Sequence, residues 1–348
     1  MSLAFSEYMH KCLYDPDNGY YMQKQNPVGS HGDFITAPEI SPALAYACAS
    51  AFIKLASSEP NLILCEVGPG SGKLMLEVIK YLVEQDCLPE QVWMVELNQN
   101  RIEQQQSLLS GLPTEISKRI IWHKVMPKHK WQGLIIANEL LDAIPFDIVR
   151  KNNSIWTELR VRQEGGQYSF YESCLRPELQ KFLPKVDVPD MYQTEIFPLL
   201  PGFLNSLTCN MDRGALLFID YGYPHQEFYH PQRVLGTSKV FLSQKSSNDL
   251  VLLPGECDIT AHVDFSLLKL CLQELGISTR AFMTQSQFLI CTKSYEQLSS
   301  LDELGYDKAC NAFKSLFFEM GDIFKVLLAE KMSDAWLSWL NNYGVDRL

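Results

Sequence analysis

Positive charge is scarce in this sequence of 348 residues, in which 30 Lys and Arg stand against 41 Asp and Glu, a formal net charge of −11. The chain also has no Lys- or Arg-rich run. Because an acidic surface repels polyanions, we expect neither a nucleic acid nor an anionic membrane as partner. A basic partner fits this charge better.

Long apolar segments and export signals are lacking as well. No apolar stretch reaches the length of a transmembrane helix, and the first residues lack a basic segment followed by an apolar one. The start is not rich in Arg and Ser, as a mitochondrial transit peptide would be. We therefore expect a cytoplasmic protein without membrane insertion.

The ten cysteines never form a CxxC pair, and most lie in apolar runs such as residues 62–67. This pattern favours buried thiols in a reducing compartment over disulfides. His, Cys and Asp do not cluster at metal-ligand spacing, so we expect no metal. No Ser-His-Asp order stands out, which argues against hydrolysis.

Short apolar runs alternate with helical spacing from residue 59 onward. This alternation predicts an α/β fold in which a parallel sheet is covered by helices on both faces. The predicted strands are 61–67, 91–97, 119–122, 134–137 and 215–221, and the predicted helices are 42–57, 73–84, 98–109 and 265–275, the last capped by Asp264.

Changes in pattern divide the chain further. We expect an N-terminal helical segment with a lid loop (1–58), a core (59–147 and 214–293), an inserted substrate-facing subdomain (148–213) and C-terminal helices packing on the core (294–348). A hairpin is predicted around Gly165-Gly166. Segments 278–284 and 287–292 look like an antiparallel strand pair. Met320, Phe324, Leu327 and Leu328 form one stripe of a predicted helix.

A glycine loop carries the sharpest local signal. Glu66 is followed by Gly68, Gly70 and Gly72, between a predicted strand and a predicted helix. Glycines let the backbone turn tightly and let a ligand approach, and the spacing GxGxG differs from the GxGxxG of dinucleotide sites. Glu96 ends the next strand, where an acid accepts hydrogen bonds from ribose hydroxyls. Together the two acids favour S-adenosylmethionine over NAD.

Motifs along nearly the whole chain resemble the MidA-like methyltransferases, the family of the mitochondrial complex I assembly factor that methylates arginine. The matching segments are residues 8–21, 32–41, 66–75, 137–147, 156–161, 218–224, 254–268 and 320–328. Two departures stand out: Ser71 replaces the usual Arg, and segment 236–245 lacks the expected histidine. The resemblance implies a class I Rossmann-like core and an S-adenosyl-L-methionine-dependent enzyme.

Candidate site residues follow from the strand ends and from this resemblance. Ligands bind beyond the carboxyl ends of parallel strands, so Glu139 is expected to clamp a guanidinium and Asn138 to line the donor pocket. Asp142 would share Glu139's side if the segment formed a helical turn, although it could instead cap a local turn. The remaining candidates are Asp33 and Thr36 for the cofactor, and Glu39, Tyr221, Asp258 and His262 on the substrate side.

Three functions stay open at this point. The first is a protein arginine N-methyltransferase, with a respiratory complex I subunit as candidate partner and a homodimer as one arrangement. The second is a methyltransferase of a small molecule or RNA. The third is a cofactor-binding assembly factor with little catalysis.

Overall fold

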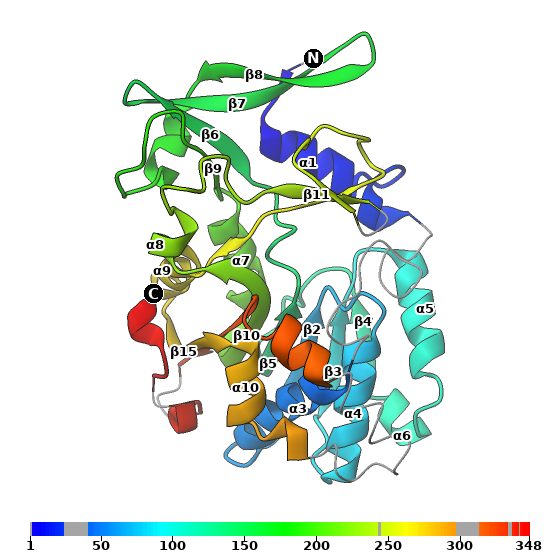
Figure 1. Cartoon of the computed structure of the whole chain (residues 1–348). Helices are drawn as coiled ribbons and strands as arrows, with labels where there is room; N and C mark the ends of the chain where they lie inside the picture. The colour runs from blue at the N-terminus through cyan, green and yellow to red at the C-terminus, as the bar shows by residue number, and fades with distance from the viewer. Residues whose placement is uncertain (1, 24–40, 243–244, 297–312, 333–335, 341) are drawn as a thin grey trace.

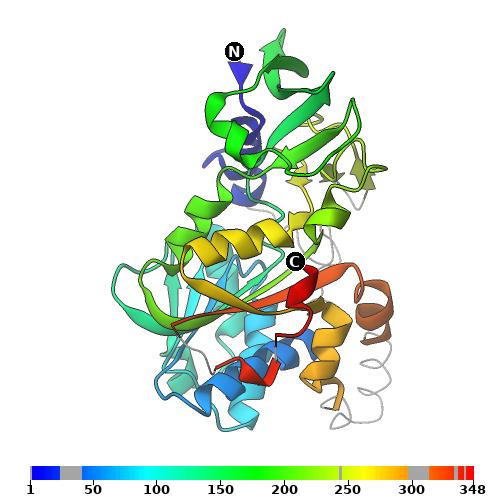
Figure 2. The same cartoon turned by 90° about the vertical axis from the view of Figure 1, so that its left-hand side faces the viewer.

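The structure, a computed structural model, describes residues 2–23, 41–242, 245–296, 313–332, 336–340 and 342–348. Figures 1 and 2 show a large α/β part and, beyond one end of its sheet, a smaller part built on a second sheet. In the described ranges no helix has the length and apolarity needed to cross a membrane. Each cysteine within those ranges is free.

The large part is organised around an eight-stranded sheet with the order β15-β16-β10-β5-β2-β3-β4, to which β14 adds beside β10. Strands β10, β5, β2, β3 and β4 run parallel, whereas β16 is antiparallel to both of its neighbours. The five predicted core strands are therefore confirmed. The bounds are β2 (Ile63–Val67), β3 (Gln91–Val95), β4 (Ile120–His123), β5 (Trp131–Asn138), β10 (Met211–Tyr223), β14 (Val263–Asp264), β15 (Ile277–Thr284) and β16 (Phe324–Lys331).

Helices cover both faces of this sheet, because alternate residues of each buried strand point to opposite sides. Leu64 and Ile136 pack with α3, α4 and α10, while Cys65 and Ile135 belong to the core that α7 and α9 cover. The helices are α3 (Ala43–Ala56), α4 (Lys73–Glu84), α5 (Gln99–Leu109), α6 (Thr114–Ser117), α7 (Leu200–Thr208), α8 (His225–Phe228), α9 (Phe265–Glu274) and α10 (Gln285–Cys291).

Close contact between β5 and β2 depends on a glycine. Gly133 has φ +154°, and a Cβ built there would lie 1.9 Å from the carbonyl oxygen of Ile63. No side chain fits at this distance. The register of the two central strands therefore requires glycine at this position.

The smaller part contains β6 to β9, which fall largely within the predicted insertion (148–213), whereas α7, also within that range, packs on the large sheet. Its sheet has the order β1-β7-β6-β9, with β8 beside β7, and the predicted hairpin is confirmed as β7 and β8. The N-terminal β1 and α1 belong here too, since β1 pairs with β7 and α1 lies along this sheet (Figure 1). The bounds are β1 (Ser2–Leu3), α1 (Phe5–Tyr14), β6 (Asp147–Asn152), β7 (Ile155–Glu164), β8 (Gln167–Cys174) and β9 (Gln193–Ile196). A separate three-stranded sheet has the order β12-β11-β13, with the bounds β11 (Lys239–Leu242), β12 (Lys245–Ser247) and β13 (Asp258–Thr260).

One buried ion pair cluster holds the second sheet together. Arg176 donates from Nη2 to Asp147 at 2.7 Å and from Nε to Glu158 at 3.0 Å. Both carboxylates are buried, with exposed fractions of 1% and 0%. Buried carboxylates without such a partner would be costly, so Arg176 is required by its neighbours.

Two predictions for the C-terminal region are wrong. Segment 287–292 is not a strand: α10 occupies Gln285–Cys291, and Thr284 and Gln287 form its capping box. Segment 324–331 is not helical but forms β16, which lies within the central sheet rather than packing on it. A short apolar run that is buried on both faces has no periodicity that distinguishes a strand from a helix, so the sequence pattern could not assign these two segments correctly.

Candidate active site

The glycine loop joins β2 to α4 as predicted and turns through left-handed backbone. Gly68, Gly70 and Gly72 have φ of +68°, +52° and +81°, and Gly72 is the residue before α4 begins. A Cβ at Gly68 would come within 2.8 Å of Leu140, whereas a Cβ at Gly70 would meet nothing within 4 Å. The loop therefore presents bare backbone to open space next to a helix N-terminus.

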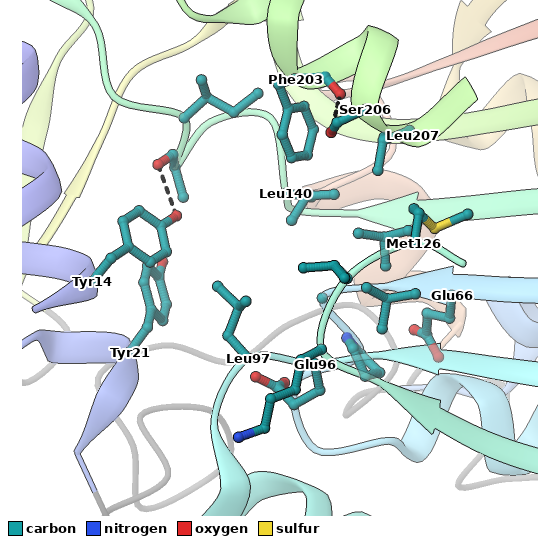
Figure 3. A pocket seen from close by; sticks show the side chains of 18 of the residues that line it. Tyr14, Tyr21, Glu66, Glu96, Leu97, Met126, Leu140, Phe203, Ser206 and Leu207 are labelled. Carbon is teal, nitrogen blue, oxygen red and sulfur yellow. Dashed lines mark hydrogen bonds between the residues drawn. The ribbon is translucent and has the colours of Figure 1, made fainter. Parts of the chain in front are cut away.

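That open space is a cavity of about 1030 Å³ at the carboxyl ends of β2, β3 and β5. In Figure 3, Tyr14 and Tyr21 stand on one side, while Glu66 and Leu207 stand on the other. The volume lies at the upper end of the range for small-molecule sites. It leaves room for a nucleoside cofactor together with part of an acceptor.

Two acids line this cavity from neighbouring strand ends, as the sequence predicted. Glu66 is 3% exposed, and its Oε2 has no hydrogen-bond partner among the described residues. Burial, assisted by the charge of Glu96, raises the pKa of Glu66 to about 8. A cationic ammonium group would satisfy this oxygen and restore the charged form.

Glu96 is held differently. Its Oε1 accepts a hydrogen bond from the backbone N–H of Asn98 at 2.9 Å, and its Oε2 lies 3.4 Å from Nε2 of Gln105. The second oxygen therefore keeps lone pairs for further donors. These three features fit S-adenosylmethionine. The unpartnered oxygen of Glu66 fits the ammonium, the glycine loop fits the methionine backbone, and Glu96 fits the ribose.

Asn138 and Glu139 line the cavity at the end of β5. Asn138 donates from Nδ2 to Oε1 of Glu139 at 3.2 Å, and its buried Oδ1 has no partner among the described residues. Glu139 has φ +50°, and its backbone N–H donates to the carbonyl oxygen of Ile219 at 2.8 Å. The backbone of Glu139 is thus in a conformation that non-glycine residues rarely adopt, which is common at functional sites.

Asp220, which the sequence analysis did not single out, fixes this turn. Its Oδ2 accepts hydrogen bonds from the three successive backbone N–H groups of residues 140–142, at 3.2, 2.9 and 3.2 Å. Burial and the neighbouring carboxylates of Asp142 and Glu139 raise the pKa of Asp220, and the N–H donors oppose that rise. Only the position of Asp220 at the end of an apolar strand hinted at this role.

Asp142 does not share the cavity with Glu139. Segment 139–142 does not form a helix, so the condition under which the two carboxylates would lie on one side is not met. Asp142 is buried, and the hydroxyl of Tyr221 donates to it. Burial raises the pKa of Asp142 to about 6.

The substrate-side candidates that the structure describes, Tyr221, Asp258 and His262, form a cluster next to Asp142 and do not line the cavity. The hydroxyl of Tyr21 donates to Asp258 at 2.8 Å, and burial with the charge of Asp142 raises the pKa of Asp258 to about 7. His262 contacts the edge of the Tyr221 ring at a centroid distance of 5.2 Å, and burial lowers the pKa of His262 to about 4. The remaining candidates, Asp33, Thr36 and Glu39, lie outside the described residues.

Several cavity residues were not among the predicted site residues. Tyr14 and Tyr21 come from α1 and the turn after it, Phe203 and Leu207 come from α7, and Arg101 comes from α5. Each of these segments meets the glycine loop only through tertiary folding. No metal-binding group of three or more His, Cys, Asp or Glu occurs within the described ranges.

Fold and site together define a class of protein: a Rossmann-like α/β protein with a nucleoside-cofactor cavity at the carboxyl edge of its sheet. Residues 43–283 match the model of the family described as "Putative S-adenosyl-L-methionine-dependent methyltransferase". The chain belongs to this family, and the resemblance to the MidA-like methyltransferases is confirmed. It is an enzyme that uses S-adenosyl-L-methionine as methyl donor.

Relatives and solved structures agree with this assignment. The chain is 27% identical to the protein arginine methyltransferase NDUFAF7, mitochondrial, of Xenopus tropicalis, over 82% of this chain and 71% of that protein. It is 26% identical to the human protein of the same name, over 77% of this chain and 65% of that one. A Burkholderia thailandensis protein solved with S-adenosyl-homocysteine superposes with a TM-score of 0.89 at 29% identity, covering 95% of this chain and 88% of that one.

Proposed function

We propose that the chain is a protein arginine N-methyltransferase. The relatives named above carry that activity in their names, at 27% and 26% identity. The acidic net charge of −11 suits a basic acceptor protein. The resemblance to the family of the complex I assembly factor makes a respiratory complex subunit the first acceptor to test.

The placement of Glu139 carries the proposal. Its half-buried side chain lines the cavity beside Asn138, on a turn that Asp220 holds by three N–H hydrogen bonds. A guanidinium is cationic at any physiological pH and presents a planar fork of N–H donors. A rigidly held carboxylate can accept two of those donors and orient the remaining nitrogen.

The contacts of Glu139 also decide where the charge of the acceptor lies and how its proton leaves during methyl transfer. Bound S-adenosylmethionine supplies a methyl group already activated by the sulfonium. Glu139 localises the positive charge of the acceptor on the nitrogens it binds, which leaves the third nitrogen more nucleophilic. The nitrogen that receives the methyl group must lose one proton, and because both oxygens of Glu139 accept from the other two nitrogens, that proton passes to solvent.

Two tyrosines and an apolar wall support binding of a flat cation. The rings of Tyr14 and Tyr21 are stacked, with centroids 5.6 Å apart, and the Tyr14 hydroxyl donates to the carbonyl oxygen of Ala143 at 2.9 Å. These contacts fix the rings at the cavity wall. Aromatic faces favour a guanidinium at close range, and the facing Leu140 and Phe203 exclude water (Figure 3).

The test is radiolabelled methyl transfer into a lysate from cells that lack this gene. Wild type, Glu139→Gln and the control Glu90→Gln, which removes an exposed carboxylate, are compared. We expect a labelled protein band with wild type and the control, label released as methylarginine on hydrolysis, and at least about a hundredfold less label with Glu139→Gln. Binding of S-adenosylhomocysteine should remain in all three.

Other outcomes point elsewhere. Label in the nucleic-acid or metabolite fraction would assign the chain to the RNA or small-molecule class of methyltransferase. Equal labelling by wild type and Glu139→Gln would refute the proposed role of Glu139 as a carboxylate clamp. Absence of any transfer, with binding of S-adenosylhomocysteine intact and Glu139→Gln fully complementing a deletion strain, would favour an assembly factor with little catalysis.

A further inference from the structure

Asn98 joins the two parts of the molecule beside the cavity. It is the N-cap residue of α5 in the large part and follows Glu96 by two positions. Its Nδ2 donates to the backbone carbonyl oxygens of Tyr21 at 2.9 Å and Gln23 at 3.1 Å, in the chain that follows α1. Asn98 is 2% exposed, so water does not compete for these hydrogen bonds.

The neighbours of the Asn98 amide favour a single orientation of its oxygen and nitrogen. Oδ1 accepts from the backbone N–H of Asn100 at 2.9 Å, which caps α5. Nδ2 faces two carbonyl oxygens, and carbonyl oxygens only accept. A flipped amide would lose all three contacts, so the cap of α5 and the hydrogen bonds to residues 21 and 23 form together.

The main chain of Asn98 holds a cavity residue as well. Its N–H donates to Oε1 of Glu96, the acid that follows β3 and lines the cavity. Asn98 itself does not line the cavity. It therefore acts on a ligand only through the residues that it holds.

The segment that the Asn98 side chain holds also lines the cavity. The turn η1 (Tyr20–Met22) contributes Tyr21 and Met22, which together are called the η1 wall, and Figure 3 shows the Tyr21 ring at one side of the cavity. The Tyr21 hydroxyl donates to Asp258 at 2.8 Å, which anchors the ring to β13. The contacts of Asn98 anchor the same segment to α5, across the boundary between the two parts.

We propose that Asn98 is a positioning residue that fixes the η1 wall relative to Glu96 and so shapes the cavity before the cofactor binds. Its two hydrogen bonds to carbonyl oxygens order the wall in the free enzyme. Without them the bound cofactor has to order the wall itself, and its affinity falls by the cost of that ordering. The role is independent of the methyl acceptor, so it stands or falls separately from arginine methylation.

Replacement of the Asn98 side chain should leave the fold intact. Tyr20 shares one hydrophobic core with Val95 of β3, so burial of apolar surface holds the two parts together. The Tyr14 hydroxyl also donates to the carbonyl oxygen of Ala143 at 2.9 Å, a second contact at the cavity wall. Variants of Asn98 therefore report on the position of the wall rather than on folding of the chain.

A double-mutant cycle read by calorimetric titration with S-adenosylhomocysteine tests this role. Asn98→Ser keeps an N-cap oxygen and the backbone N–H on Glu96, and it removes the two Nδ2 donors. We expect binding to weaken by about 10- to 30-fold, the range for two lost hydrogen bonds. Tyr21→Leu removes the ring that the wall presents, and in that background Asn98→Ser should change the affinity by less than about threefold.

Two substitutions at an exposed neighbour serve as controls. Gln99→Ser is the matched control for Asn98→Ser and should bind like wild type. Asn98→Asp keeps the size of the side chain and the cap but cannot donate, so it should bind at least as weakly as Asn98→Ser, with Gln99→Glu as control for the added charge. It replaces Asn98→Ser if thermal unfolding shows that variant to be misfolded.

Hydrogen exchange at the N–H of Asn100 separates positioning from capping, because both Asn98 variants keep an oxygen for that N–H. Exchange there should match wild type. Wild-type affinity of Asn98→Ser would overturn the proposal, and so would equal weakening by Asn98→Ser with and without the Tyr21 ring. Faster exchange at Asn100 together with the loss of affinity would assign Asn98 to capping of α5 and overturn the proposal as well.

Discussion

Replacing Glu66 with glutamine should stabilise the ligand-free enzyme more strongly as the pH rises. The pKa of Glu66 is raised from 4.5 to about 8, because burial disfavours the charged form. In the unfolded chain the group ionises at its ordinary pKa. Ionisation therefore favours unfolding, so the stability of wild type falls as the pH rises through that window and levels off above about pH 8.

The magnitude follows from the size of the shift. With 1.36 kcal/mol per pKa unit, Glu66 costs about 1 kcal/mol at pH 5, about 3 kcal/mol at pH 7 and about 5 kcal/mol at pH 9. Glu66→Gln keeps the shape and removes the charge. For a chain of 348 residues, about 4 kcal/mol between pH 5 and pH 9 corresponds to a change of about 5 °C in the Tm difference.

Thermal unfolding of protein freed of bound nucleoside, recorded from pH 5 to pH 9, measures this difference. The exposed Glu90→Gln serves as control and should track wild type. A Tm gap between wild type and Glu66→Gln that stays constant with pH would refute the reasoning. Calorimetry should add a second signature: affinity for S-adenosylhomocysteine rises towards pH 8 in wild type and not in Glu66→Gln.

Three further substitutions test how the site and the sheets are held. Asp220→Asn opposes three backbone N–H groups with an amide, so we expect a loss of about 2–3 kcal/mol in chemical denaturation, and an unchanged midpoint would contradict the turn-fixing role. Gly133→Ala forces a Cβ against a carbonyl oxygen and should abolish soluble expression, whereas Gly165→Ala, with nothing within 4 Å and φ +58°, should cost about 1 kcal/mol. Arg176→Met removes the ion pair of buried Asp147 and leaves buried Glu158 with only its longer contact to Arg160, so it should destabilise by about 3 kcal/mol, with a smaller loss in acid; a loss under about 1 kcal/mol at neutral pH would be the contrary result.

The parallel core was predictable because its elements obey local rules. The helix at 73–84 has the predicted bounds, and Asp264 caps α9 with hydrogen bonds from the N–H groups of Ser266 and Leu267. Strand β16 was not predictable in the same way. Six of its eight residues are buried between β10 and β15, and that burial arises from pairing with segments far away in sequence.

The site residues likewise fall into those that local rules predict and those that only tertiary packing brings to the cavity. Glu66, Glu96 and Glu139 follow strands, so the rule for parallel sheets brings them to one cavity. Tyr14 and Arg101 reach it from helices whose docking no local pattern encodes. The separation of Asp142 from Glu139 depends on the left-handed backbone of Glu139 and on hydrogen bonds to the distant carboxylate of Asp220. Residue spacing alone predicts neither.

The place of β16 has a consequence for biosynthesis. It is the last strand in chain order among the described residues, yet it is hydrogen-bonded on both sides, between β10 and β15. A nascent chain that has not yet reached residue 324 therefore carries two apolar strands whose facing edges have no partner, and such edges recruit strands from other molecules. Nonsense mutations upstream of that point should yield aggregates and chaperone-bound chains rather than a shortened enzyme.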